Sequence, residues 1–262
     1  MKIRVLGCHG SDSLLEPGAG APACRACGFL VDETILVDAG TIGAALTFSE
    51  QKRIRYILIS HLHFDHIQGL PTLADSLFDD PARPVVLVSI PEVLKGLHTH
   101  IFNGHVYPDF TQLPNRERPV FQFLPVEPCR PVEIGKFRVT AVPVNHQVPT
   151  VGFLIDDGVS GMLYSGDTYE TAELWRLARE MPTLKAAFIE ASFPNAMGEV
   201  AKISQHLTPA LFAEEFRKIG RPDLAVYPYH LKPRFRDTLR RELQDLGISK
   251  LEMLEEGLEV VL

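Results

Sequence analysis

Histidine and aspartate are concentrated in one short segment, Ser60-His61-Leu62-His63-Phe64-Asp65-His66, directly after a strand-like apolar run. Imidazole nitrogen and carboxylate oxygen bind zinc at about 2.0–2.2 Å, and a hydrolytic site also keeps one position open for water. His61 and His63 are two residues apart, so on an extended backbone they share a face. Asp65 and His66 lie where the chain turns and can face a second metal. The spacing predicts a metal-binding loop, and its alternative is a solvated histidine-rich turn.

Four further candidate ligands lie far apart in the sequence, namely His146, Asp167, His206 and His230. Each follows a strand-like run or precedes a helix start, and Thr208-Pro209 after His206 is typical of an N-cap followed by proline at the first helical position. Any one of them alone is more often an ordinary core or surface polar residue. Together they predict one rim of a layered fold, where all these side chains meet.

The elements that must position these residues follow from hydrophobic periodicity. Strands are predicted at 2–6, 29–31, 34–38, 56–60, 85–90, 136–144, 151–155, 161–165, 186–189 and 224–227, and helices near 68–78, 170–181, 208–219 and 234–246. Strands come in consecutive pairs before helices in both halves of the chain, which favours two packed sheets with helices outside. Residues 91–131 are rich in Pro, His and Asn and predict an irregular insertion or lid within one domain spanning 1–262.

Composition narrows the class of protein. The chain has 262 residues, 45% of them hydrophobic and 23% charged, and a net charge of −7, which is ordinary for a soluble globular protein. An acidic chain has no global field favouring nucleic acid or an anionic membrane. A membrane-spanning helix needs about 18 consecutive apolar residues, and no apolar run approaches that length. The charged N-terminus lacks the apolar core of a signal peptide. With four cysteines in a chain this long, a reduced compartment and a cytoplasmic location are expected.

The chain resembles the metallo-β-lactamase superfamily, whose signature His-x-His-x-Asp-His matches residues 61–66, and the match spans nearly the whole chain. The resemblance implies a four-layer αββα sandwich and two divalent cations, zinc by family expectation with manganese or iron as alternatives. By the family pattern the first metal is held by His61, His63 and His146, the second by Asp65, His66 and His230, and Asp167 bridges them.

Within the superfamily the chain is similar to class II 3′,5′-cyclic-nucleotide phosphodiesterases at residues 5–8, 38–41, 59–70, 164–168, 188–195, 206–209 and 230–233. This resemblance implies attack of a metal-bound hydroxide on a phosphodiester, with a cyclic nucleotide such as cAMP opened to a nucleoside 5′-monophosphate. Phe64 departs from the Leu usual there, and the pair in Cys24-Arg25-Ala26-Cys27 is unusual. A structural zinc site could be formed by Cys24 and Cys27 together with Cys8 and His9. The alternative is that these cysteines are buried thiols without a metal.

A second resemblance is to tRNase Z, through Glu190-Ala191-Ser192 and His206-Leu207-Thr208. It implies that Glu190 and His206 form a proton-donating dyad with Asp65 as the base, and the alternative is a structural ion pair. An RNA 3′-processing endonuclease is therefore the alternative function, although the acidic charge and the single basic cluster at 52–55 favour a small-molecule substrate over nucleic acid. A lactonase or thioesterase and a non-catalytic metal or nucleotide sensor are the remaining alternatives.

Two expectations concern surfaces. His98, His100 and His105 are predicted to line a substrate mouth, with Tyr107 and Phe110 nearby to stack on a base, and a third metal site is the alternative for these histidines. A homodimer is expected only because dimers are common among soluble proteins.

Overall fold

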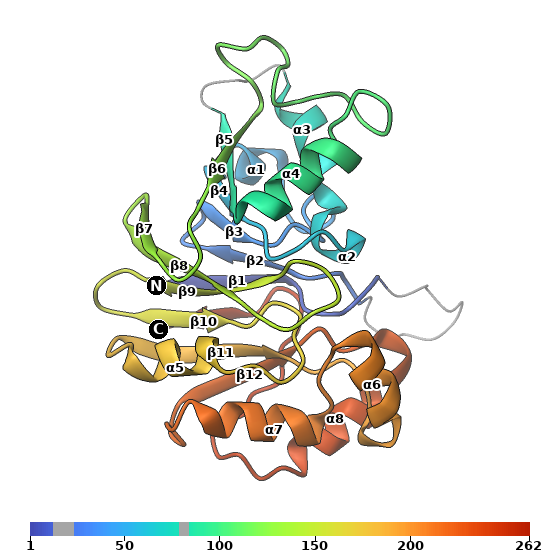
Figure 1. Cartoon of the computed structure of the whole chain (residues 1–262), viewed down its shortest axis with the longest axis vertical. Coiled ribbons are helices and arrows are strands. Elements are labelled where there is room, and N and C mark those ends of the chain that lie inside the picture. The colour runs from blue at the N-terminus through green and yellow to red at the C-terminus, as the bar shows by residue number, and fades with distance from the viewer. Residues whose placement is uncertain (13–23, 79–83) are drawn as a thin grey trace.

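The computed structural model describes residues 1–12, 24–78 and 84–262, whose strands form two sheets packed face to face (Figure 1). The first sheet has the order β13-β1-β2-β3-β4-β5-β6 and the second the order β12-β11-β10-β9-β8-β7. The first sheet consists of β1 (Lys2–Gly7), β2 (Gly28–Val31), β3 (Ile35–Val37), β4 (Tyr56–Leu58), β5 (Val85–Ser89), β6 (Phe121–Pro125) and β13 (Glu259–Val261). The second consists of β7 (Pro131–Ile134), β8 (Phe137–Pro143), β9 (Val151–Asp156), β10 (Gly161–Tyr164), β11 (Leu184–Glu190) and β12 (Ala225–Tyr229).

Helices cover the outer face of each sheet, which confirms the predicted four-layer αββα arrangement (Figure 1). The first sheet carries α1 (Phe48–Gln51), α3 (Gly69–Leu77) and α4 (Pro91–His100), and the second carries α5 (Glu173–Glu180), α7 (Pro209–Lys218) and α8 (Arg236–Gln244). Two short helices, α2 (Phe64–Ile67) and α6 (Gly198–Ser204), lie on the same side of the sandwich, on the right in Figure 1, α2 in the half of the first sheet and α6 in the half of the second. Short 3-10 turns occupy Asn195–Met197 and Pro233–Phe235.

The two sheets share a buried aromatic core. Phe29 of the first sheet packs edge-on against Tyr164, Phe188 and Tyr229 of the second, with ring centroids 5.4–5.6 Å apart. Such edge-to-face pairs contribute about 0.5–1.5 kcal/mol each beyond the area they bury. This core fixes the position of one sheet relative to the other, and hence of the side chains at their ends.

All ten predicted strand runs are confirmed, and so are the four predicted helices. The prediction of irregular structure over 91–131 is wrong at both ends of that range, where α4 and β6 form. Pro91 occupies the first turn of α4, a favourable helix start, and Val93, Leu94 and Leu97 bury one face of it. The polar residues on its outer face obscured that period. The role of residues 101–120 as a lid stays a prediction. Among the described residues, no helix has both the length and the apolar character that crossing a membrane requires.

Candidate metal centre and proton-donor pair

The predicted ligands come from both sheets and meet at one end of the sandwich. The segment from His61 to His66 follows β4 of the first sheet, whereas His146, Asp167 and His230 follow β8, β10 and β12 of the second. Strands β10, β11 and β12 are parallel neighbours, so their carboxyl ends share one edge, the edge at which α/β sheets usually bind ligands. The fold therefore gathers residues separated by up to 169 positions, from His61 to His230.

A first group of ligand atoms belongs to His61, His63, His146 and Asp167, and these atoms lie within 4.8 Å of one another. The His63 Nδ1 and His146 Nε2 atoms are 3.1 Å apart. Three imidazoles and a carboxylate in this spacing are a donor set suited to zinc or a similar divalent cation.

A second group faces the same carboxylate. The Oδ2 atom of Asp167 lies 3.3 Å from His66 Nε2 and 3.2 Å from His230 Nε2. It also lies 3.6 Å from His61 Nε2 of the first group, while Asp65 Oδ2 is 3.2 Å from His230 Nε2. Asp167 thus lies between the two groups, as the family pattern implies for a bridging ligand.

Five buried side-chain polar atoms of the described residues have no hydrogen-bond partner, and three of them belong to this centre: His61 Nε2, His66 Nε2 and Asp167 Oδ1. An unsatisfied buried polar group costs about 1–3 kcal/mol. Burial also lowers the pKa of His61 well below its usual value and so keeps that ring neutral, the form that binds a metal. These orphaned atoms fit bound divalent cations.

Asp38 fixes the orientation of the histidine loop, a role that the sequence analysis missed. Its buried carboxylate accepts hydrogen bonds from the Ser60 backbone N–H (2.8 Å), the Ser60 hydroxyl (2.7 Å) and the Tyr164 hydroxyl (2.6 Å). It also accepts the His66 Nδ1 proton at 2.7 Å. Because a carboxylate only accepts, His66 carries its proton on Nδ1 and presents a free Nε2 to a metal.

Glu190 and His206 form a buried pair beside the ligand cluster. His206 Nδ1 and Glu190 Oε1 are 2.7 Å apart. Burial lowers the pKa of His206, but the Glu190 carboxylate outweighs it and holds the pKa above its usual value. Glu190 also accepts the Thr168 backbone N–H and the Ser192 hydroxyl, at 3.1 and 2.8 Å. A protonated imidazole in this position is a competent general acid near neutrality.

Ser192 connects this pair to the ligand cluster. Its Oγ lies 2.8 Å from His230 Nδ1 as well as 2.8 Å from Glu190 Oε2. Donating to the carboxylate and accepting from the imidazole satisfies both contacts, which leaves His230 Nε2 free to bind a metal. No signal in the sequence indicated this role, because it is the pairing of β11 with β12 that brings Ser192 close to His230.

The cysteines are arranged differently from the zinc site considered above. Cys8, Cys24 and Cys27 are buried, as the alternative expects. Cys8 clusters with His9 and Glu256, whereas Cys27 clusters with His66 and His230. The four-ligand set of the three cysteines and His9 is therefore not assembled.

The predicted stacking surface is also not formed as expected. Phe110 is only 3% exposed and packs against Phe78 and Phe102 in the core, so it cannot stack on a base. Tyr107 contacts Phe110 and hydrogen-bonds Asp75. Phe64, which lies within the histidine loop itself, is an apolar residue whose exposed fraction is 63%.

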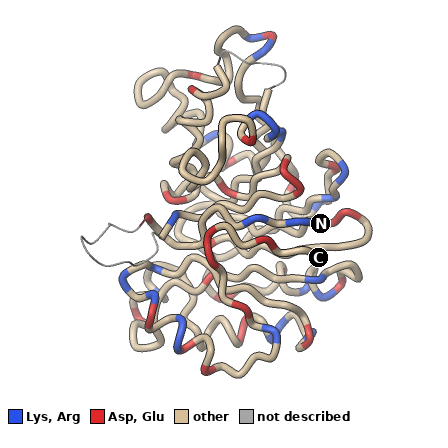
Figure 2. The backbone as a smooth tube through the Cα atoms, turned by 180° about the vertical axis from the view of Figure 1, so that it is seen from behind, with Lys and Arg blue, Asp and Glu red and all other residues tan. Residues whose placement is uncertain are grey.

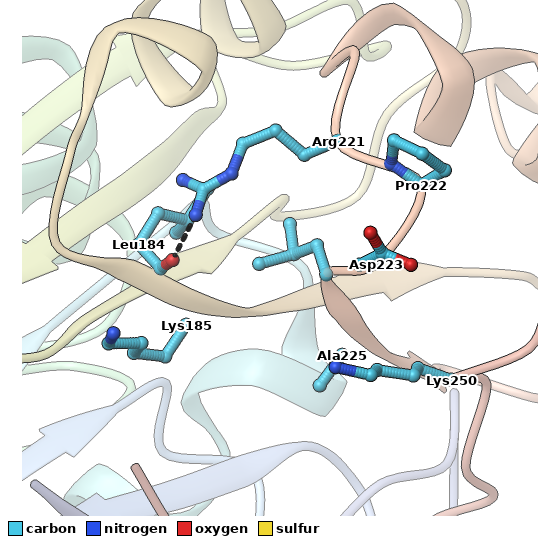
Figure 3. Close-up of a pocket in the computed structure, with 8 residues that line it drawn as sticks. Leu184, Lys185, Arg221, Pro222, Asp223, Ala225 and Lys250 are labelled. Atoms are coloured by element: carbon cyan, nitrogen blue, oxygen red, sulfur yellow. Dashed lines mark hydrogen bonds between the residues drawn. The ribbon is translucent and has the colours of Figure 1, made fainter.

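A separate cavity of about 420 Å³ lies at the other ends of β11 and β12, where those strands begin (Figure 3). Its lining includes Lys185, Arg221 and Lys250, and the Arg221 guanidinium is engaged by the Leu184 carbonyl at 2.8 Å. The cavity is therefore separate from the metal centre.

Comparison with known proteins agrees with this geometry. The model of the "Beta-lactamase superfamily domain" matches residues 33–231. A "Probable 3′,5′-cyclic-nucleotide phosphodiesterase" of Yersinia pestis is 28% identical, with 79% of this chain and 68% of that protein covered. A "Ribonuclease Z" of Metallosphaera sedula is 30% identical, but the match covers 53% of this chain and 46% of the relative. The crystal structure of unliganded yeast PDE1 superposes with a TM-score of 0.81 at 18% identity, covering 100% of this chain and 99% of that one.

Proposed function

Because the chain belongs to the β-lactamase superfamily, we propose that it is a hydrolase that uses two divalent metal ions to cleave a 3′,5′-cyclic nucleotide such as cAMP. The observation that carries the proposal is the buried Glu190–His206 pair, 2.7 Å apart, beside the ligand cluster. The ribose 3′ alkoxide released from a phosphodiester is a poor leaving group, so a proton donor beside the ligand cluster would assist its departure. The phosphodiesterase-named relative supports the same substrate class.

The ligands proposed for the first metal are His61, His63 and His146, and those for the second are Asp65, His66 and His230. Asp167 lies between the two groups. Divalent cations there would polarise a phosphoryl oxygen and lower the pKa of bound water. No side-chain nucleophile is then required.

His206 is the proposed general acid. Its Nδ1 proton is held by Glu190, so Nε2 is the nitrogen that would donate a proton to the leaving ribose 3′ oxygen. His206 is 6% exposed and its ring lies 5.0 Å from that of His146, which places the donor beside the proposed metal position.

Asp65 is the proposed proton acceptor for the attacking water. Burial raises its pKa, but the neighbouring His230 and His66 imidazoles outweigh burial and keep the pKa well below the usual range. The carboxylate is therefore ionised at neutral pH. A strongly acidic group is a weak base, so we assign Asp65 a larger part in holding the metal than in proton transfer.

RNA 3′-end processing is the second candidate, favoured by the ribonuclease Z relative and by the same Glu190–His206 pair. Against it, Lys and Arg are interleaved with Asp and Glu along the described backbone (Figure 2), and the net charge is −7. An enzyme that grips many phosphates of a tRNA is expected to concentrate basic side chains on one face.

The deciding experiment measures release of 5′-AMP from 3′,5′-cAMP by protein loaded with zinc or manganese, with a chelator-treated sample as control. A tRNA precursor with a 3′ trailer is assayed in parallel. Saturable, metal-dependent release that falls in His206→Ala and not in Asp237→Ala, whose side chain is 94% exposed, supports the proposal. Cleavage of the precursor without turnover of cAMP would replace it with the second candidate.

A further inference from the structure

The buried thiol of Cys27 lies close to two of the ligands proposed for the second metal, and neither the sequence motif nor the family pattern assigns it as a ligand. Its Sγ atom is within 4.8 Å of the ligand nitrogens of both His66 and His230. All three residues are fully buried. The other faces of the two imidazoles are already engaged, by Asp38 on His66 and by Ser192 on His230, so Nε2 is the nitrogen each ring has left for a metal.

An unpartnered atom marks this cluster as a ligand site. His66 Nε2 has no hydrogen-bond partner although the ring is completely buried. The Cys27 thiol donates only to the His9 carbonyl oxygen, at 3.3 Å. A sulfur atom within 4.8 Å of ligand nitrogens of two buried imidazoles is a donor set typical of a thiophilic metal site.

The backbone holds Cys27 tightly against the metal-binding loop. Gly40 donates its N–H to the Cys27 carbonyl at 2.8 Å. A Cβ at Gly40 would lie 2.0 Å from the Asp65 carbonyl oxygen and 2.6 Å from that of Cys27. Gly40 is therefore packed between the backbone of the segment before β2 and that of the segment that carries Asp65, which holds the two segments near each other.

We propose that Cys27 is an additional, thiolate ligand of the second metal, which makes that position selective for zinc and other thiophilic cations. The inference rests on the metal centre proposed above. On binding, the thiol proton leaves to solvent, the hydrogen bond to the His9 carbonyl is lost, and a metal–sulfur bond of about 2.3 Å takes its place. Soft thiolate donors favour zinc, cobalt and cadmium, whereas manganese prefers oxygen.

The test is a cobalt(II) titration of metal-free protein followed by absorption spectroscopy, because a cobalt–thiolate bond gives a near-ultraviolet charge-transfer band and histidine or carboxylate ligands do not. We expect the band to appear in the wild type and in Cys24→Ser and Cys8→Ser, and to be lost in Cys27→Ser. Cys27→Ser should also weaken zinc binding at one site by about tenfold or more, with a smaller change for manganese.

Two equivalents of bound cobalt without the band would overturn the proposal. A band that persists in Cys27→Ser and disappears in Cys8→Ser would also overturn it, because it would place the thiolate in the cluster of Cys8, His9 and Glu256. If Cys27→Ser does not fold, X-ray absorption of the zinc-loaded Cys8→Ser protein decides the question by the presence or absence of a sulfur neighbour.

Phosphodiesterase activity is measured on the same samples. A charge-transfer band without turnover leaves Cys27 as a ligand and removes the proposed function. Turnover without the band supports the proposed function and excludes Cys27 as a metal ligand.

Discussion

At the scale of single residues, Asp167 connects the two halves of the site. Its Oδ2 atom approaches imidazoles of both ligand groups at 3.2–3.6 Å, and its Oδ1 atom is buried without a partner. The three histidines gathered around this carboxylate would lose the group that they share if it were removed. The loss should therefore affect both metal positions.

Asp167→Ala is expected to lower metal content and turnover together. The loss should exceed the roughly 10- to 100-fold loss that is typical when a residue hydrogen-bonded to a metal ligand is replaced. Metal per chain is measured by elemental analysis after dialysis. Asp237→Ala is the matched control, because its side chain is 94% exposed. Full metal content in Asp167→Ala would show that Asp167 is not a metal ligand.

Glu190 and His206 make a prediction about pH. Burial lowers the pKa of His206 and Glu190 raises it by more. Removing the negative charge in Glu190→Gln therefore lowers that pKa, so the acid loses its proton earlier and the alkaline limb of kcat moves to lower pH.

The same pair predicts a separation of metal binding from turnover. His206→Ala should slow turnover by about 10²–10⁴-fold while metal content stays at the wild-type level. If the alkaline limb is unmoved in Glu190→Gln and His206→Ala retains full turnover, the pair is a structural ion pair.

The sequence indicated the histidines and aspartates that the structure gathers at this centre, because ligand chemistry is carried by residue type and strand ends by periodicity, but it did not indicate that Cys27 lies near His66 and His230. The supporting residues were not visible in the same way. Asp38 reaches His66 across 28 positions and Ser192 reaches His230 across 38, contacts that depend on sheet pairing. Their types, Asp and Ser, are too common in turns to signal such a role.

At the scale of elements, long apolar runs were predictable and short edge strands were not. The terminal strands β7 and β13 are four and three residues long, and most of their positions are exposed or half-buried. A strand of that kind has no hydrophobic alternation to detect. Strand β13, near the C-terminus, pairs with β1, near the N-terminus, and no local sequence pattern indicates such a pairing.

The start of α7 was predictable and gives a test of how that helix supports the proton donor. The Thr208 hydroxyl accepts the Leu211 backbone N–H at 3.4 Å, and Pro209 follows at the first helical position. Thr208→Ala should lower the free energy of unfolding by about 1 kcal/mol, measured by urea denaturation. Since His206 lies two residues before the cap, turnover should also fall, but by less than in His206→Ala. Thr208→Ser keeps the hydroxyl and should restore both; a Ser variant as unstable as Ala would exclude the cap.

At the scale of the whole molecule, the candidate metal centre spans the contact between the two sheets. The first sheet supplies His61, His63, Asp65 and His66 through β4, and the second supplies His146, Asp167 and His230 through β8, β10 and β12. The Tyr164–Asp38 hydrogen bond of 2.6 Å crosses the same contact. Metal binding therefore requires both sheets to be folded and docked, so a cation that binds here stabilises the whole sandwich.

Chelation should accordingly lower the thermal midpoint of the whole chain. A ligand at 100 times its Kd adds about 2.7 kcal/mol, which corresponds to about 5–10 °C per filled site in a protein of this size. Scanning calorimetry with and without EDTA measures the shift, and Asp167→Ala should show a much smaller one. Because the ligands are divided between the sheets, the metal-loaded protein should unfold in a single transition. Two transitions, with chelation moving only one, would mean that the sheets unfold separately and that one of them holds the metal without the other.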